Sequence, residues 1–587
     1  MGDNELNNGP PGSETRPGRP PSSSSSASSD GGAAGQDTEK TFDKKEHHLD
    51  SDIDHDEIEA VVPGHDLDVE LANHPGPEAL KRLESRGSVK SKVSRALSIV
   101  SRRKTKEKER IAFAPIPVTN LDEGIVGWDS QDDPHMPLNF PNSRKWLLVG
   151  LISTITFITP FASSILAPGI GSLNAEFGNS NEIVGAMTVS IYLLGYVVGP
   201  LFLAPLCEIY GRRPVLTGTN VFFCAWQIGC ALAPNIESLI AFRFFSGIGG
   251  SGCLTLGAGV IADVFRTDER GFAMGIYTLG PLIGPTVGPL IGGFLSQTIG
   301  WRWDFWIVFI VAVIIVALTE IFTQETNHHV LIQRKVKRLR KELGRDDLQS
   351  CYEVGKEKQT HTRLLLNGLV RPTKMLILSP LVLSLSIYLA FAYGVLYLLF
   401  TTIPIVFKET YRWNIGLTGL VYISLGLGNF AGWGVVTAYS DKSVIRQTKA
   451  NGGIFEPEMR MPMTIYFSLT LPITFFWYGW TTYYKTHWIW PVMSLFPFSF
   501  GIIGLFLPIV TYLVDCYPVY AASAVAANTV LRSLVGMLLP LAGPAMYDNL
   551  GLGWGNSVLG FICVAMIPVP ALIYRFGGRL RKMGLQL

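Results

Sequence analysis

The chain has 587 residues, of which 48% are hydrophobic and only 16% are charged, and its formal net charge at pH 7 is +2. Charged residues make up about a quarter of an ordinary soluble domain, so this composition argues against a soluble globular protein. The seven cysteines are scattered and form no CxxC pair of the metal-binding type. We therefore expect them to be small buried hydrophobic residues, with no metal site and no redox centre.

The polar N-terminal region, with stretches such as PSSSSSASSDGG, predicts a disordered cytoplasmic tail over residues 1–143. No positively charged segment followed by an apolar core opens the chain, so no cleavable signal peptide is expected. A basic cluster between Lys81 and Arg110 admits two interpretations. It either only fixes the membrane topology, or it binds anionic lipids and is released when kinases phosphorylate Ser88 or Ser98.

Twelve apolar runs follow the tail, each close to the roughly 20 residues that an α-helix needs to cross the hydrocarbon core of a bilayer. The runs span residues 146–168, 183–206, 215–234, 238–262, 271–297, 302–323, 376–403, 415–438, 462–483, 488–514, 522–545 and 553–575. A soluble core would not repeat such runs so many times. The predicted fold class is therefore an all-α membrane protein with twelve transmembrane helices.

Lys and Arg gather in alternate breaks between the runs, which predicts that both termini are cytoplasmic. The polar segment 324–374 divides the spans six and six, so we expect bundles at 144–323 and 375–578 and a short cytoplasmic C-terminus at 579–587. Two such bundles joined by a cytoplasmic linker are typical of transporters, whose substrate path lies between the bundles near mid-membrane. The sequence contains no filter-like signature of a channel.

The fifth run contains GPLIGPTVGP, in which glycines recur every four residues and prolines recur beside them. Small residues let membrane helices approach closely, and proline is tolerated in a span when neighbours satisfy the freed carbonyl groups. We expect this stripe to pack on a helix of the opposite bundle, with the prolines setting a bend. A packing face with no role in transport is the alternative. The stripe comprises Gly280, Pro281, Gly284, Pro285, Gly288, Pro289 and Gly292.

Several segments, taken in order, resemble motifs of a known family. GPLIGPTVGPLIGG is similar to the fifth-helix antiporter motif of the major facilitator superfamily, LCEIYGRRP to its loop motif after the second helix, and RFFSGIGGSG to its fourth-helix motif. WDSQDDPHMPLNFPNSRKW and YAASAVAANTVLRS resemble the fungal twelve-spanner drug:proton antiporters of the polyamine and multidrug exporter group. Departures are Glu208 for the usual Asp, Pro289 for a glycine and Phe140 for Trp.

The resemblance covers about residues 128–580 and implies the major facilitator fold. It also implies proton-coupled efflux of small organic compounds, such as drugs, antifungals, toxins or polyamines, by alternating access. The fungal plasma membrane is the implied location, with the vacuolar membrane as the alternative.

The loop CEIYGRRP carries both signs of charge at a tight cytoplasmic turn, which a glycine allows. Its glutamate and first arginine can pair with charged residues at the cytoplasmic end of the fourth helix, latching the inside until the bundles rock. Alternatively, the two arginines only obey the positive-inside rule. The candidate gate comprises Glu208, Gly211, Arg212, Arg213, Asp263 and Arg266.

Two arginines lie within predicted spans, Arg243 in the fourth and Arg532 in the eleventh. An arginine there costs about 3 kcal/mol on insertion scales and usually faces the bundle interior. The resemblance implies a role in proton transfer or in tuning a proton carrier, while hydrogen bonding to the carbonyl groups of broken helices is the structural alternative. The carrier itself is not evident. Candidate carboxylates at span ends, most of them expected to be ordinary interfacial groups, are Glu182, Asp304, Glu320, Glu409 and Asp515.

Aromatic and amide side chains suggest where substrate binds. Two tyrosines share one face of the second helix, two more share one face of the seventh, and two isolated asparagines lie in apolar runs. Such a set suits amphipathic or cationic organic substrates, although each tyrosine alone is also consistent with packing. The candidate cavity residues are Tyr192, Tyr196, Tyr393, Tyr397, Asn429 and Asn528.

The leading hypothesis is therefore a proton-coupled exporter, with proton-coupled uptake or a nutrient sensor that does not transport as alternatives. An enzyme is disfavoured because every histidine lies outside the predicted spans and no metal-ligand or nucleophile–base cluster is found. No P-loop sequence occurs, so ATP should not drive transport directly. We expect a monomer without cofactors, whose partners are a small-molecule substrate, protons and the lipid bilayer, and no nucleic acid.

Overall fold

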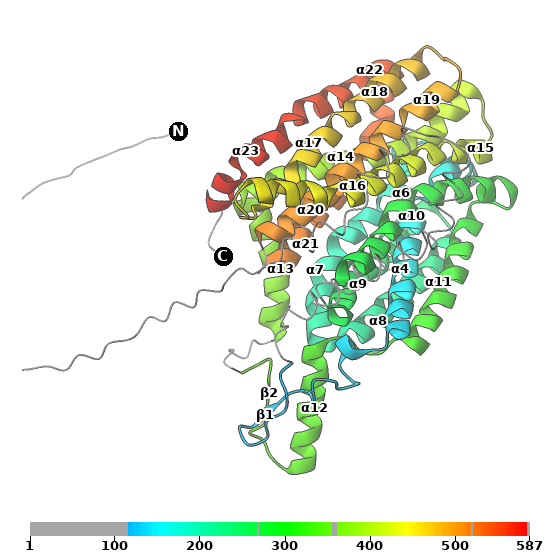
Figure 1. Cartoon of the computed structure of the whole chain (residues 1–587). Helices are drawn as coiled ribbons and strands as arrows, with labels where there is room; N and C mark the ends of the chain where they lie inside the picture. Colours follow the sequence, from blue (N-terminus) through cyan, green and yellow to red (C-terminus); the bar gives the residue numbers. More distant parts are fainter. Residues whose placement is uncertain (1–115, 267–268, 355–360, 518–519, 584–587) are drawn as a thin grey trace, which may run out of the picture. The chain divides into compact units, whose positions relative to one another are not determined.

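The computed structural model of this protein describes residues 116–266, 269–354, 361–517 and 520–583, and these are largely helical (Figure 1). The N-terminal bundle comprises α4 (Asn142–Ser164), η4 (Ala167–Gly169), α5 (Ile170–Phe177), α6 (Glu182–Ser190), α7 (Tyr192–Tyr210), α8 (Arg212–Ala231), α9 (Ile236–Val264), α10 (Arg270–Thr298) and α11 (Arg302–Phe322). Its helices cover the first six predicted runs.

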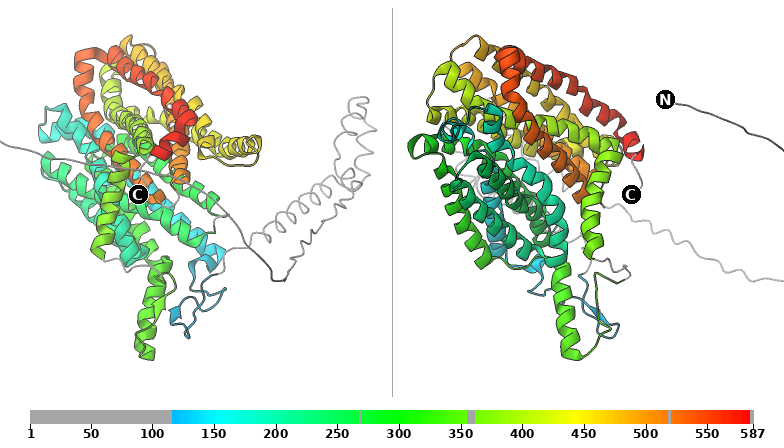
Figure 2. Two further views of the ribbon diagram at one scale, coloured as in Figure 1. Left: turned by 90° about the vertical axis from the view of Figure 1, so that its left-hand side faces the viewer. Right: turned by 180° about the vertical axis from the view of Figure 1, so that it is seen from behind.

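The C-terminal bundle covers the remaining six predicted runs. It comprises α14 (Pro380–Tyr411), α15 (Ile415–Leu420), α16 (Tyr422–Ala450), η5 (Pro457–Arg460), α17 (Met461–Ser468), α18 (Thr470–Tyr483), α19 (Ile489–Ser494), α20 (Phe496–Cys516), α21 (Ala521–Leu538), η7 (Leu539–Ala542), α22 (Gly543–Met566) and α23 (Pro568–Met583). In the views of Figures 1 and 2, α4–α11 lie together and α14–α23 lie together. Contacts between the two bundles come mainly from α10 with α15 and α16, and from α7 with α21.

Nine segments of the described chain are long and apolar enough to cross a membrane, and one of them runs from Ala521 to Arg581. That segment reverses within α22. Gly551 has φ 69° and ψ 172°, a backbone conformation that glycine favours. The Tyr547 hydroxyl donates to Asn556 Oδ1 over 3.2 Å, whereas nine residues of straight helix would hold these residues about 13 Å apart. The segment therefore has two antiparallel arms, which match the eleventh and twelfth predicted runs.

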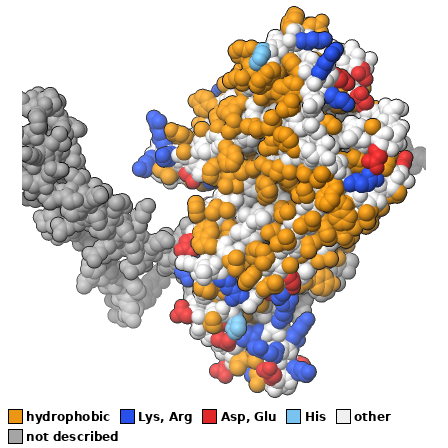
Figure 3. Space-filling view, turned by 90° about the vertical axis from the view of Figure 1, so that its right-hand side faces the viewer, with side chains coloured by type: hydrophobic (Ala, Val, Ile, Leu, Met, Phe, Trp, Pro, Cys, Tyr) orange, Lys and Arg blue, Asp and Glu red, His pale blue; other side chains and the backbone are white. Residues whose placement is uncertain are grey.

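The surface of the bundles is apolar where lipid would lie. Along α11, Ile310, Ile314 and Leu318 recur every four residues and are all exposed. In the view of Figure 3, hydrophobic side chains cover a broad area of one face, and charged side chains gather toward its margins. Five of the seven cysteines are buried, as the sequence predicted, while Cys351 and Cys516 are half-buried.

The segment between the bundles contains α12 (His328–Leu343), β2 (Gln349–Ser350) and α13 (His361–Leu378). Asn327 caps α12 by accepting hydrogen bonds from the backbone of His329 and Val330. We call the side of the bundles where this linker attaches, next to Phe322 and Pro380, the linker end, and the opposite side the linker-distal end.

The boundary of the predicted disordered tail is corrected by the structure. Residues 116–141, which the sequence assigned to the tail, fold against the linker: β1 (Ile125–Val126) pairs in parallel with β2, Ile125 opposite Gln349. A buried cluster joins both segments through Val126, Trp128, Met136, Ile332, Val336 and Leu348. The apolar residues scattered through 116–141 supply enough surface for this small core. The rest of the predicted tail, with Ser88 and Ser98, lies outside the described residues.

Candidate functional site

The glycine stripe of α10 forms a close seam, but with a different partner from the one predicted. A Cβ atom added to Gly284 would lie 2.6 Å from the carbonyl oxygen of Phe157, and one added to Gly288 would lie 2.7 Å from that of Phe161. Gly280 is less tight, with its added Cβ 3.0 Å from the backbone nitrogen of Phe157, and Gly292 lies against the carbonyl oxygen of Ile165, the C-cap of α4. Because α4 belongs to the same bundle as α10, the expectation that the stripe packs on the opposite bundle is wrong for its four glycines. Pro289 alone meets that bundle among the stripe contacts described, since a Cβ added to Gly419 would lie 2.8 Å from the Pro289 carbonyl oxygen.

The prolines of this stripe explain part of the seam's chemistry. Pro289 has no N–H group, so the carbonyl of Pro285 loses its helical partner. The Ser164 hydroxyl of α4 donates to that carbonyl over 2.8 Å. A neighbouring helix thus satisfies a carbonyl freed by proline, as expected for a membrane span.

A neighbouring face of α10 contacts the C-terminal bundle. The Gln297 side chain accepts a hydrogen bond from the backbone of Gly416 over 2.7 Å, and a Cβ added to Gly293 would lie 3.0 Å from the Ile415 carbonyl oxygen. The Asn429 side chain donates to the Leu282 carbonyl over 3.1 Å. Asn429, a predicted cavity residue, therefore bridges the bundles at this contact.

Arg243 is fully buried in α9 and binds the ends of two other helices. Its guanidinium donates to the carbonyl groups of Ala162 and Ser163, in the last turn of α4, over 2.7 and 2.6 Å. It also donates to Thr188 O, near the end of α6, over 3.0 Å. Helix C-termini present unpaired carbonyl groups and a partial negative charge, which suit a guanidinium. This geometry matches the structural alternative that the sequence left open for Arg243.

Asp304 is the fully buried member of the five candidate carboxylates. Its Oδ2 accepts a hydrogen bond from the Ser296 hydroxyl over 2.8 Å, while Oδ1 has no hydrogen-bond partner among the described residues. The next residue, Phe305, places its ring 5.6 Å from the Arg243 guanidinium carbon. Asp304 therefore lies in the same buried region as Arg243.

The other four candidate carboxylates lie at surfaces or in ion pairs. Glu320 pairs with Arg213 over 2.6 Å, and Asp515 pairs with Arg460 over 2.5 Å. Glu182 and Glu409 are exposed and line a pocket of about 190 Å³ at the linker-distal end.

The four predicted tyrosines meet where the two bundles face one another. Ring centroids are 5.2 Å apart for Tyr192 and Tyr196 in α7, and 5.1 Å apart for Tyr393 and Tyr397 in α14. The hydroxyl groups of Ser163 in α4 and Tyr397 in α14 lie 2.7 Å apart and share a hydrogen bond. The sequence named these four tyrosines as candidate cavity residues on two helices, and the structure places the two pairs on facing helices of the two bundles.

Polar atoms without partners lie on α7 and α21, and one of the residues that carry them contacts the tyrosine cluster. The Arg532 guanidinium carbon lies 4.6 Å from the Tyr393 ring and 4.8 Å from the Phe506 ring. Arg532 Nε, both amide atoms of Asn528 and the Tyr196 hydroxyl have no hydrogen-bond partner in the described part of the chain. Buried polar atoms are normally paired, so a group of unpaired ones marks a place for water or ligand.

One ion pair predicted within the candidate gate is present at the linker end of the N-terminal bundle. Arg212 Nε donates to Asp263 Oδ2 over 3.0 Å. Gly211 begins the turn with φ 105°, which side chains disfavour. Glu208 is exposed, and the ion pair predicted for it is not found among the described residues. Arg266 lies one residue beyond Phe265, the C-cap of α9.

Sequence reasoning missed Glu325, which ties the linker to this gate. Glu325 Oε1 accepts hydrogen bonds from the backbone of Arg212, Thr326 and Asn327 over 2.8, 3.0 and 2.9 Å. The carboxylate thus caps the first turn of α8 from outside that helix. A carboxylate directly after the sixth apolar run was the available signal, because a linker that begins there must pass the gate.

The chain is similar in sequence to a known protein family and to named fungal proteins. The sequence model described as Major Facilitator Superfamily matches residues 152–540. The chain is 47% identical over 456 residues to "MFS transporter cpaT" of Aspergillus oryzae, covering 78% of this chain and 91% of that protein. It is 43% identical over 462 residues to "Efflux pump radE" of Floropilus chiversii, covering 78% and 85%.

Among solved structures, the partially occluded inward-open conformation of the xylose transporter XylE from E. coli is similar, with a TM-score of 0.56. The identity is 16%, and the alignment covers 74% of this chain and 98% of that one. At this identity the likeness concerns the fold alone.

Proposed function

The chain belongs to the major facilitator superfamily, and we propose that it exports small organic compounds in exchange for protons. Membership makes it a multi-pass membrane transporter. Export is favoured because one similar fungal protein is named an efflux pump. Twelve crossings, cytoplasmic termini, a plasma-membrane location with the vacuolar membrane as alternative, and a monomeric state belong to the same proposal.

The group of unpaired polar atoms beside the tyrosine cluster carries this proposal. Arg532, Asn528 and Tyr196 come from both bundles and offer donors and acceptors that the described residues leave unfilled. The charged group at this place is a cation, flanked by the ring of Tyr393. We therefore favour aromatic substrates that present carbonyl or acidic oxygen atoms over the cationic substrates suggested by the tyrosines alone.

Asp304 is the proton carrier in this proposal. A carboxylate that is fully buried with one unpaired oxygen would bear a large cost as a charge, and holding a proton removes that cost. A rearrangement of the bundles that lets water reach this carboxyl group from the cytoplasmic side would release the proton there. The nearby Arg243 would favour that release by stabilising the carboxylate.

The contacts between bundles favour an arrangement closed at the linker-distal end. The contacts of α10 with the C-terminal bundle run from Leu282, near the middle of that helix, to Gln297, near its linker-distal end. At the linker end, Gly368 of α13 lies against Pro205 of α7, so a linker helix is placed where the bundles would separate. Rocking about this line would give alternating access.

Full-length protein in proteoliposomes tests the proposal. We expect an acidic lumen to drive accumulation of Lucifer yellow, an aromatic sulfonate with pH-independent fluorescence, and a protonophore to abolish it. Asp304→Asn should abolish gradient-driven accumulation, while Glu409→Gln, which changes an exposed carboxylate, should leave it unchanged. Accumulation driven by an acidic exterior would instead indicate uptake, and accumulation with ATP alone would contradict proton coupling.

A further inference from the structure

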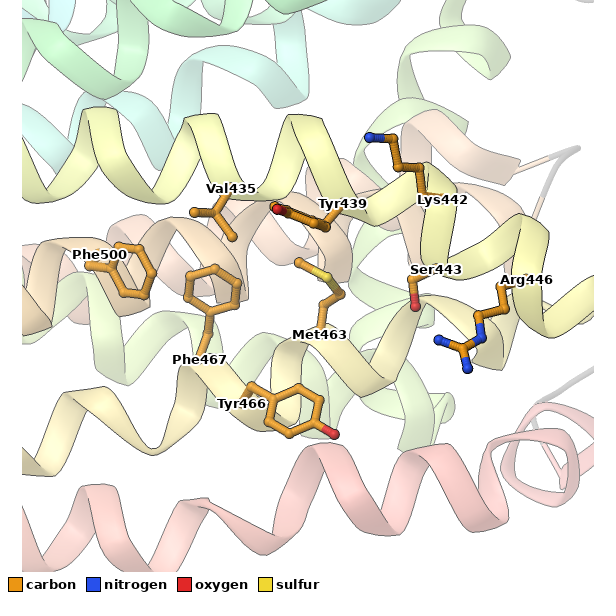
Figure 4. Close-up of a pocket in the computed structure, with 9 residues that line it drawn as sticks. All are labelled: Val435, Tyr439, Lys442, Ser443, Arg446, Met463, Tyr466, Phe467 and Phe500. Carbon is orange, nitrogen blue, oxygen red and sulfur yellow. The ribbon is translucent and has the colours of Figure 1, made fainter. Parts of the chain in front are cut away.

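A groove on the C-terminal bundle lies apart from the tyrosine cluster and the gate. It has a volume of about 500 Å³ and runs between α16 on one side and α17 and α20 on the other (Figure 4). Its residues on α16 lie between Val435 and Arg446, in the part of that helix that approaches the linker end. Tyr439 and Tyr466 on its walls are 58% and 74% exposed, so the groove opens to the surroundings.

The groove exists because α16 diverges from α20. Gly428 and Gly432 hold the two helices in contact: added Cβ atoms would lie 2.6 Å from Phe496 O and 2.7 Å from Phe500 O. Val435 and Tyr439 are the next residues on the same helical face, and they line the groove instead of contacting α20 backbone.

The polarity of the groove changes along its length. At one end, the rings of Phe467 and Phe500 pack with centroids 4.8 Å apart and form an apolar floor beside Val435. Figure 4 shows this floor at one end of the groove and the side chains of Lys442 and Arg446 at the other. Arg446 lies eleven positions after Val435 on the same helix, a rise of about 16 Å. Half of the hydrocarbon core of a bilayer is about 15 Å thick.

The two cations at the polar end have no carboxylate opposite them. Lys442 lies 5.7 Å from the ring of Tyr439, and neither Lys442 nor Arg446 makes an ion pair within the described residues. The neighbouring Asp441 forms an ion pair with Arg460 instead, with 3.7 Å between Asp441 Oδ1 and Arg460 Nη1. The polar end of the groove therefore carries an uncompensated positive charge next to an apolar floor.

We propose that this groove binds an anionic phospholipid from the leaflet on the linker side. One acyl chain lies on the floor formed by Val435, Phe467 and Phe500, and the phosphate lies between Lys442 and Arg446. Tyr439 sits between these levels, at the depth of the glycerol backbone, where tyrosines are common in membrane proteins. Basic pockets between membrane helices on the cytoplasmic side suit acidic headgroups. This site does not depend on the proposed substrate or on proton coupling.

Native mass spectrometry of the full-length protein tests the site. The protein is incubated in detergent with either phosphatidylserine or phosphatidylcholine, and bound lipid is counted. For Lys442→Gln/Arg446→Gln we expect phosphatidylserine affinity to fall about 25-fold, about fivefold for each basic side chain near the headgroup, with phosphatidylcholine binding unchanged. The matched control is Lys337→Gln/Arg338→Gln, which removes the same charge from the exposed face of α12. Control protein should bind phosphatidylserine like the wild type.

A second variant tests the acyl chain. Val435→Trp fills the apolar floor and keeps both cations, so it should also lose phosphatidylserine binding. Equal losses in the α12 control would show general charge attraction and overturn the site. Phosphatidylserine binding by Val435→Trp at the wild-type level would also overturn the site. This holds whatever the KM of that variant for Lucifer yellow, because the acyl chain would then not lie on this floor.

Discussion

Each bundle has an arginine inside a span, Arg243 in the N-terminal bundle and Arg532 in the C-terminal bundle, and the two differ in their hydrogen-bond partners. Arg243 is fully buried and donates to three backbone carbonyl groups at the ends of α4 and α6. Arg532 is half-buried, rests on the rings of Tyr393 and Phe506, and leaves Nε without a partner among the described residues.

The difference follows from where helices break. α4 ends at Ser164, next to the Pro168 turn, and α6 ends at Ser190, so unpaired carbonyl groups surround Arg243. α21 continues through Asn528 and Arg532 without a break and offers no helix end. An arginine inside a span therefore becomes structural or available for ligand according to the broken helices around it.

Replacing Arg243 should have the largest effect on stability. Arg243→Ala would leave three buried carbonyl groups unpaired, at a cost of about 1–3 kcal/mol each. We therefore expect the free energy of unfolding to fall by about 3 kcal/mol or more. Arg243→Lys should recover only part of this, because lysine lacks the fork that reaches two helices. The measurement is the thermal unfolding midpoint of the purified protein. A wild-type midpoint for Arg243→Ala would remove the distinction between the two arginines.

The α10–α4 seam should be the next most sensitive. Gly288→Leu should destabilise the protein and abolish efflux, and Gly288→Ala should also cost about 1–3 kcal/mol because its Cβ would lie 2.7 Å from Phe161 O. Gly275→Ala on the same helix is the control, since no atom lies within 4 Å of its Cβ. Equal midpoints for the two alanine variants would contradict the seam.

Replacing Arg532 should change transport more than stability. Arg532→Gln removes no carbonyl partner, so its midpoint should stay near that of the wild type. Loss of one charged hydrogen bond to an acidic substrate should raise the KM for Lucifer yellow about tenfold. Transport of the cationic dye rhodamine 6G should not weaken. If Arg532→Gln instead lost transport of rhodamine 6G and kept transport of Lucifer yellow, the assignment of acidic substrates would be contradicted.

Glu325 should give the smallest effect. Glu325→Ala removes the cap on the first turn of α8 and should cost about 1 kcal/mol, whereas Glu325→Gln keeps an acceptor oxygen and should cost less. Glu208→Ala, at an exposed carboxylate of the same gate, is the control and should be neutral. The thermal midpoint distinguishes these variants, and an equal loss at Glu208 would show that the gate depends on general charge.

The sequence predicted the helices and the gate pair better than it predicted contact partners. Apolar length and family motifs located the runs that the helices of the two bundles cover, although not α12 of the linker, and the loop motif anticipated the pair of Arg212 with Asp263. The glycine spacing predicted that one face of α10 packs closely on another helix, but it did not predict that this helix is α4. Periodicity defines a face of a helix and does not define which element covers it. The position of Glu325 just after the sixth apolar run was a signal for its place in the chain, but its partner Arg212 lies 113 residues away, and no local pattern records that contact.

Substrate protection of an introduced cysteine tests the division between the two arginines most directly. Arg532→Cys and, beside Arg243, Thr188→Cys would each be treated with a charged methanethiosulfonate reagent. Labelling above the wild-type level would be measured without Lucifer yellow and with the dye at a concentration well above the raised KM expected for an Arg532 variant. We predict that Cys at position 532 reacts and is protected by the dye, while Cys at the fully buried position 188 does not react. Equal reactivity at both positions, or no protection at 532, would contradict the account.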